Sequence, residues 1–116
     1  MIFQDLDVWK RSKNLSVVVY KTINSSPIQK DFCLRDQIQR CAISIPSNIS
    51  EGYSRDSDKD RIHFFYIAKG SAAELWTQIT IAVEIGLLTP INGKEILKEA
   101  DEIQRMLAGL IKALKK

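Results

Sequence analysis

The sequence has little of what metal-binding or phosphate-binding sites require. Its 116 residues include one histidine, His63, five scattered glycines and three prolines. A dinuclear metal site in a helical bundle needs two Glu-x-x-His units, whereas here a single Asp60-x-x-His63 has no counterpart. The glycines lie too far apart to build a phosphate-binding loop. We therefore expect no metal and no cofactor.

The cysteines are also few. Cys33 and Cys41 are the only two, and if both lie on one helix they are separated by about 12 Å along its axis, beyond disulfide reach. Unpaired thiols are typical of a reducing compartment. Residues 1–10 lack the features of a signal peptide, and no stretch of about 18 apolar residues occurs. These absences predict a cytoplasmic protein that does not bind membranes.

No group of residues indicates a catalytic reaction. No serine lies in a strained nucleophile turn, and Cys41 falls on a predicted core face. Glu74 and Gln78 are one helical turn apart, which favours an interhelical or intersubunit hydrogen bond over acid–base chemistry. We expect no enzymatic activity.

Composition and helical periodicity predict an all-α fold. With 45% apolar and 27% charged residues, the chain is long enough for a single domain over residues 1–116. Four helices are expected at about 6–24, 34–53, 58–85 and 90–114, and no strand-like alternation competes with them. Their short connections predict an antiparallel up-down-up-down four-helix bundle.

Capping residues set the expected ends of these helices. Asp5 and Ser57 are placed to cap the first and third helices, and Thr89-Pro90 begins the fourth. Gly86 ends the third helix. Pro46 lies inside the second, where the apolar period continues in phase, so we expect a kinked but single helix.

Each helix has an expected core face. Asn48 and Gln37, at the edge of the second face, are expected to satisfy backbone groups that Pro46 loosens. The predicted core residues are Val8, Ser12, Leu15, Val18, Val19, Thr22, Ile23, Leu34, Ile38, Cys41, Ala42, Ile45, Ile49, Gly52, Phe65, Ala68, Ala72, Leu75, Ile79, Val83, Ile96, Ala100, Ile103, Leu107, Leu110 and Leu114.

More apolar surface is present than one bundle can cover. Such surface marks a protein contact, and without a strongly basic flank it favours self-association over membrane binding. The candidate residues for an oligomer interface are Trp9, Tyr20, Ile43, Ile67, Ile81 and Ile85.

The basic residues are organised in two strips. The net charge is +3, and a stripe of cations away from the core can follow a phosphate backbone. The alternative is a solvated face of ion pairs, because Glu95, Asp101 and Glu102 lie three or four residues from these cations. The candidate nucleic-acid-binding residues are Lys94, Lys98, Arg105, Lys112 and Lys116 on the fourth helix, and Lys10, Lys13 and Lys21 on the first.

Four motifs resemble a known family. They are Phe3-x-x-Leu6-x-Val8-Trp9-Lys10, Leu34-x-x-Gln37-Ile38-x-Arg40, Ser44-Ile45-Pro46-Ser47-Asn48-Ile49-Ser50-Glu51-Gly52, and Ile67-Ala68-x-Gly70-Ser71-x-x-Glu74-Leu75-x-Thr77-Gln78. They are similar to the four helix bundle protein family, also called the S23 ribosomal protein or 23S rRNA intervening-sequence protein family. Cys41 and Ser50 depart from the usual pattern, which has alanine at the first position and the form N-I-A-E-G around the second.

The resemblance carries expectations about assembly and partners. It implies a cytoplasmic bacterial protein that forms a ring-like homopentamer, and the ribosomal label implies no ribosomal role. It extends to the accessory variability protein of diversity-generating retroelements, a basic pentamer that binds nucleic acid and a reverse transcriptase. We therefore expect a non-catalytic oligomer with sequence-independent RNA or DNA binding. The alternative is an adaptor that binds a partner protein and no nucleic acid.

Overall fold

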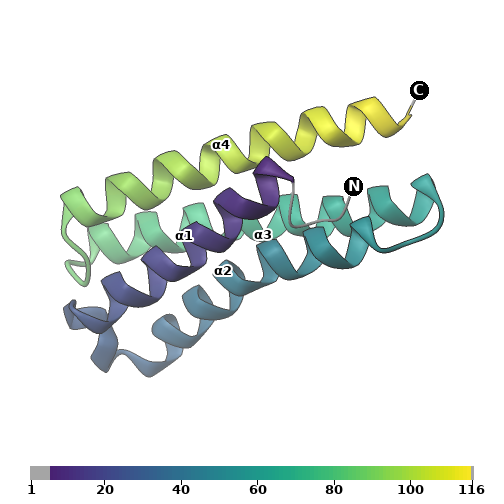
Figure 1. Cartoon of the computed structure of the whole chain (residues 1–116). Coiled ribbons are helices and arrows are strands. Elements are labelled where there is room, and N and C mark those ends of the chain that lie inside the picture. The colour runs from purple at the N-terminus through teal and green to yellow at the C-terminus, as the bar shows by residue number, and fades with distance from the viewer. Residues whose placement is uncertain (1–5, 116) are drawn as a thin grey trace.

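The chain, described over residues 6–115 by a computed structural model, is built from helices alone. Within these residues no strand occurs, which confirms the all-α class, and each expected helix is present with ends no more than two residues from the predicted ones. The elements are α1 (Asp7–Asn24), a 3₁₀ helix η2 (Pro27–Lys30), α2 (Phe32–Tyr53), α3 (Asp58–Glu84) and α4 (Pro90–Lys115) (Figure 1).

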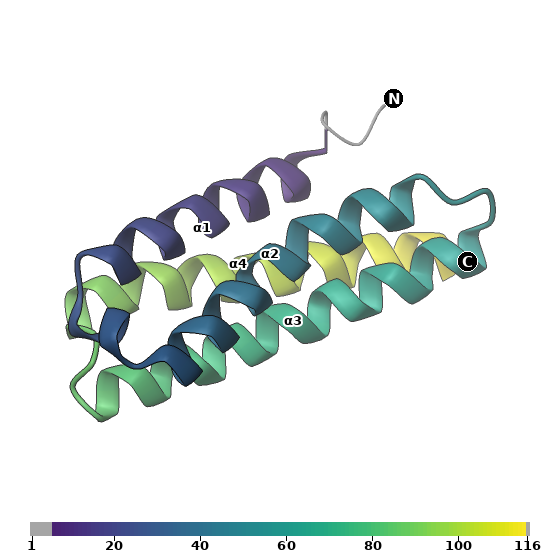
Figure 2. The ribbon, with the colours of Figure 1, turned by 90° about the horizontal axis from the view of Figure 1, so that it is seen from below.

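The four α-helices pack as a bundle of 44 × 21 × 18 Å. Both α1 and α3 pack against α2 and α4, so α1 and α3 lie on opposite sides of the bundle (Figure 2). The α1–α2 and α3–α4 connections meet at one end, where the backbone N–H of Ile28 donates to Leu87 O at 3.2 Å. Ile28 belongs to η2, which the sequence did not predict, and it is fully buried.

Polar residues cap three of the helices, and two of these caps, Ser57 and Thr89, are the ones that the sequence predicts. Asp31, Ser57 and Thr89 each accept a hydrogen bond from the backbone N–H three residues later. Asp31 explains why α2 begins two residues before the expected position. Gly86 follows α3 with φ of 81°, a left-handed conformation that suits glycine and ends the helix. Asp5, the expected cap of the first helix, lies outside the described residues.

The core face of α1 differs from the prediction. Val18 was expected inside but is 41% exposed, whereas Ser16 is buried. The prediction for Val18 is wrong because α1 turns the side that carries Ser16 toward α2. On α4, Ile111 is buried although it was not expected in the core. The predicted core residues that are only half-buried are Thr22, Leu34, Cys41, Val83, Leu110 and Leu114.

A hydrogen bond between helices compensates for Pro46. Pro46 lies inside α2, which continues as one helix through it. Because proline has no N–H, the carbonyl oxygen of Ala42, four residues earlier, loses its helical donor. The Ser16 hydroxyl of α1 donates to this oxygen at 2.8 Å and also lies 3.0 Å from Ser12 O. The freed carbonyl is therefore satisfied from the neighbouring helix.

The two residues expected to satisfy the backbone near Pro46 do not reach the freed oxygen. The Asn48 amide donates to Ser44 O at 2.8 Å, a different carbonyl, and the Gln37 amide lies 3.7 Å from Cys33 Sγ. Asn48 thus donates to a backbone carbonyl near Pro46, as expected, whereas Gln37 reaches none among the described residues. The Ala42 oxygen takes its donor from another helix, which spacing along α2 does not predict.

Candidate nucleic-acid interface

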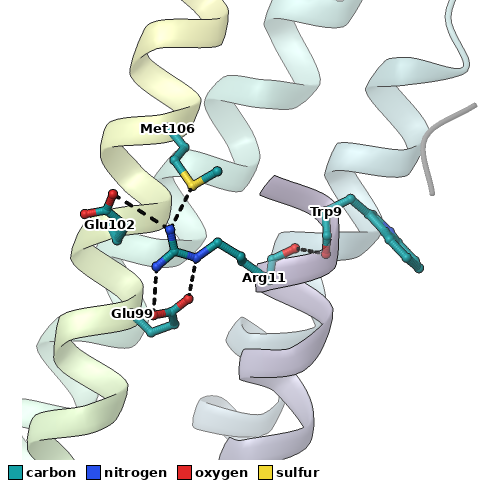
Figure 3. A network of polar contacts seen from close by, with 6 residues as sticks. Trp9, Arg11, Glu99, Glu102 and Met106 are labelled. Carbon is teal, nitrogen blue, oxygen red and sulfur yellow. Dashed lines mark hydrogen bonds and ion pairs between the residues drawn. The ribbon is translucent and has the colours of Figure 1, made fainter. Parts of the chain in front are cut away.

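Two acids of α4, Glu99 and Glu102, lie on the side that faces α1. The Arg11 guanidinium donates to both carboxylate oxygens of Glu99, at 2.7 and 3.0 Å, and lies 3.8 Å from Glu102 (Figure 3). Met106 Sδ accepts a longer bond from Arg11 at 3.6 Å. The hydrogen bond to Glu99 raises the pKa of Arg11, whose guanidinium, like that of any arginine, is charged at neutral pH. Arg11 therefore neutralises these acids from outside α4.

The remaining two acids of α4 make no ion pair with the described residues of α1. Asp101 pairs with Arg105 at 3.2 Å, and Glu95 makes no ion pair with any described residue. Of the cations on α4, only Arg105 is therefore held by an acid in the part of the chain that the structure describes. The alternative hypothesis was a solvated face of α4 covered by ion pairs. Among the described residues, the acids and cations of α4 form one such pair with each other, Asp101–Arg105.

Lysines of the predicted stripe lie exposed beside α3. Lys94 and Lys98 line one depression between α3 and α4, and Lys112 lines another. None of the three pairs with an acid in residues 6–115. Lys116, the last residue of the stripe, lies outside the described residues.

The larger depression, the α3–α4 groove, combines an apolar surface with a cationic rim. It has a volume of about 660 Å³, and Trp76, which is 42% exposed, faces it from α3. Its lining residues are Trp76 and Val83 from α3, and Pro90, Lys94, Leu97, Lys98, Asp101 and Gln104 from α4.

A second depression, the Tyr66 hollow, repeats this combination nearer the end of α4. Its volume is about 250 Å³, and it is lined by Tyr66 and Lys69 from α3 and by Lys112 and Lys115 among others from α4. The Lys115 ammonium donates to Tyr66 Oη at 2.7 Å and lies 5.2 Å from the centre of the ring. Each depression thus pairs one aromatic ring of α3 with lysines of α4.

These α3 residues were absent from the sequence-based candidates. At 100° per residue, Lys69 and Trp76 fall on the same side of a helix. This shared side is the one sequence signal that connects a cation with an aromatic ring there. Spacing on one helix does not tell which neighbour that side meets. The packing of α3 against α4, which the sequence does not give, is what brings these aromatic rings next to the lysines.

The second predicted basic strip remains separate. Lys10, Lys13 and Lys21 are exposed on α1 and make no ion pair with the described residues. None of the three lines the α3–α4 groove or the Tyr66 hollow. The structure therefore does not join the two strips into one surface.

The candidate interface residues lie on three helices. Ile43 on α2 is 45% exposed, and Ile67, Ile81 and Ile85 on or just after α3 are 39%, 45% and 59% exposed. Trp9 and Tyr20 on α1 are half-buried. Further exposed apolar side chains that sequence reasoning did not single out are Val17, Phe32 and Ile91.

The polar groups between α2 and α3 include a thiol beside a carboxylate. The Cys41 thiol donates to Glu74 Oε2 at 3.7 Å, and burial together with this carboxylate raises the pKa of the thiol. Gln78 Oε1 is buried without a hydrogen-bond partner among the described residues. Glu74 therefore has the interhelical hydrogen bond that the sequence favours, whereas Gln78 Oε1 has no partner among the described residues. A protonated thiol is a poor nucleophile.

His63 is exposed and packs edge-on against Phe64, with 5.2 Å between the ring centres. Across residues 6–115 no three His, Cys, Asp or Glu side chains gather in a way that could hold a metal ion. None of the described helices has the length and apolar character needed to span a membrane.

Comparison with known proteins identifies similar chains. A family model described as 23S rRNA-intervening sequence protein matches residues 4–109. The chain also resembles the crystal structure of a protein of unknown function from the S23 ribosomal protein family of Bacteroides thetaiotaomicron. That match has 25% sequence identity and a TM-score of 0.82, and it covers 90% of this chain and 98% of the other. No curated protein matches the chain.

Proposed function

The chain belongs to the 23S rRNA-intervening sequence protein family, and from this premise we propose that it is a non-catalytic, antiparallel four-helix bundle that assembles into a homo-oligomer and binds nucleic acid without sequence preference. The expected assembly is a pentamer in the cytoplasm. The nucleic acid lies along the side of the bundle where α3 meets α4.

One observation supports the binding surface above the others. Five lysines lie along the α3–α4 groove and the Tyr66 hollow, and none pairs with an acid in the described chain. Lysines without acidic partners attract phosphates and release counterions when they bind them. These lysines are Lys69, Lys94, Lys98, Lys112 and Lys115.

The separation of the α4 charges makes this attraction stronger. Because Arg11 holds Glu99 and lies near Glu102 on the α1 side, these carboxylates do not neutralise the lysines beside α3. Assembly adds to the effect, since five copies of a +3 chain carry about +15.

The apolar residues support assembly through two unlike surfaces. Trp9 and Tyr20 lie on α1, whereas Ile67 and Ile81 lie on α3 at the opposite side of the bundle. A twofold dimer uses one self-complementary patch, but a ring joins two different patches head to tail. Patches on opposite sides of the bundle favour a ring. Native mass spectrometry at micromolar concentration should give about 66 kDa for a pentamer of the 13.2 kDa chain, and a monomer would contradict the assembly.

A salt titration tests the binding surface. Affinity for a short RNA or DNA duplex, measured by fluorescence anisotropy, should fall linearly with salt on logarithmic axes. A Lys94→Ala/Lys98→Ala variant should weaken binding and lower the slope by about 2, one for each lost phosphate contact.

The matched control removes the same charge from the first helix. Lys13→Ala/Lys21→Ala should leave the slope nearly unchanged, and equal effects of the two pairs would refute the assignment to α3 and α4. Absence of binding at about 50 mM salt, both for this duplex and for a single strand, would refute nucleic-acid binding altogether. In that case the adaptor role, with a partner protein on the exposed apolar residues, would be the better account.

A further inference from the structure

The α3–α4 groove offers more than positive charge. The Trp76 indole, 42% exposed, shares the groove with Lys94 and Lys98 on the facing helix, and Val83 and Leu97 complete the apolar part of the lining. A flat aromatic ring beside unpaired ammonium groups matches a nucleotide, which has a flat base and a charged phosphate.

The same combination recurs along the bundle. Tyr66 precedes Trp76 by ten residues on α3, a separation of about 15 Å along the helix axis. Lys112 and Lys115 stand beside Tyr66 as Lys94 and Lys98 stand beside Trp76. Aromatic rings that lie near lysines at successive points of a surface are typical of proteins that bind a single nucleic-acid strand.

We propose that this groove binds unpaired nucleic acid, with one base stacked on Trp76 and the adjacent phosphates at Lys94 and Lys98. The proposal rests on the proposed function and specifies its substrate as a single strand. In a duplex both faces of each base are covered by neighbouring base pairs, so only the phosphates could reach the groove. An unpaired base exposes a face that Trp76 can cover.

The charges in the groove argue against a second copy of the chain as its occupant. An apolar surface docked there would remove Lys94 and Lys98 from water without a compensating partner, which is costly. Asp101, the one acid in the lining, pairs with Arg105 at 3.2 Å and so does not cancel the lysines.

The first test compares a single strand with a duplex. Anisotropy at about 50 mM salt would measure binding of a 12-nucleotide uridine RNA, the corresponding thymidine DNA and a hairpin duplex of the same charge. Both single strands should bind at least about 10-fold more tightly than the duplex, and within a few-fold of each other, because stacking does not involve the sugar. Tighter binding of the duplex, or a preference above 10-fold between the single strands, would overturn the proposal.

The second test removes the ring. Trp76→Ala should weaken single-strand binding by roughly 5- to 150-fold, the range for loss of one stacked base, and reduce the preference over duplex. Trp76→Phe should retain most of the affinity. Phe32→Ala, which removes a ring at the start of α2 that is even more exposed than Trp76, is the control and should change nothing.

The intrinsic fluorescence of the unsubstituted protein tests stacking without relying on the fold of any variant. Uridine RNA should quench the emission, and Trp76→Phe, which leaves Trp9 as the remaining tryptophan, should abolish the quenching. Binding without quenching would refute stacking on Trp76 while leaving the phosphate contacts intact. Absence of all binding would refute the proposed function itself.

Discussion

The hydrogen bond from the Ser16 hydroxyl to Ala42 O should increase the free energy of unfolding. It should do so because Pro46 deprives this oxygen of its helical donor. Ser16→Ala removes the hydroxyl that donates to this oxygen at 2.8 Å. A buried acceptor left without a partner costs about 1–3 kcal/mol, and the better helix propensity of alanine returns about 0.5 kcal/mol. We therefore expect the free energy of unfolding to fall by about 1–2 kcal/mol.

A double-mutant cycle separates this contact from simple packing. Pro46→Ala supplies an N–H four residues after Ala42, so the carbonyl regains a helical donor. In that background Ser16→Ala should cost less than about 0.5 kcal/mol, which gives a coupling energy of about 1 kcal/mol. Urea denaturation followed by circular dichroism, at one protein concentration because assembly shifts stability, would measure it.

Ser12→Ala is the matched control for this cycle. Ser12 is also buried on α1, but its hydroxyl donates to Trp9 O within the same helix. Its cost should be the same with proline or alanine at position 46. If Ser16→Ala costs equally in both backgrounds, the freed carbonyl does not explain the buried serine.

Two further predictions concern α2 and α3. Gly52→Ala should lower the free energy of unfolding, measured by urea denaturation, by about 1–3 kcal/mol, because the new Cβ would lie 2.9 Å from the Phe65 ring. Gly70→Ala is the control and should be neutral or stabilising, because no atom lies within 4 Å of its new Cβ. Alkylation of Cys41 by iodoacetamide, followed by mass spectrometry, should rise at higher pH than for an ordinary thiol, since burial and the Glu74 carboxylate raise its pKa. Glu74→Gln removes one of these causes and should shift that pH profile downward, and an unchanged profile would exclude the carboxylate as a cause.

The helices could be predicted from sequence because their ends are set locally. Ser57 and Thr89 cap their own helices, and Gly86 ends α3 by its own conformation. The narrow stripe of α4 also predicts most of its buried face, because leucine and isoleucine recur there at helical spacing. These signals need no knowledge of a neighbouring helix.

The sequence-based predictions of core and site residues are wrong or incomplete where a residue's environment is set by a neighbouring helix. Periodicity favoured Val18 over Ser16 as a core residue because valine is apolar. Ser16 is buried because Pro46, on another helix, leaves a carbonyl that a hydroxyl can satisfy. Trp76 was missed for a related reason, since its proposed role depends on the lysines that α4 places in the same groove.

The arrangement of α3 is compatible with both the proposed assembly and the proposed nucleic-acid binding. Phe65 and Leu75 face the core, Trp76 faces the groove beside α4, and Ile81 remains exposed. On the proposed assembly, a contact through Ile81 leaves the groove open, so every added copy brings another groove. A strand that spans several grooves then binds through effective concentration, and one stacked base per chain is sufficient for useful affinity. On this proposal, the apolar character of α3 on more than one side serves the core, the groove and the contact between copies.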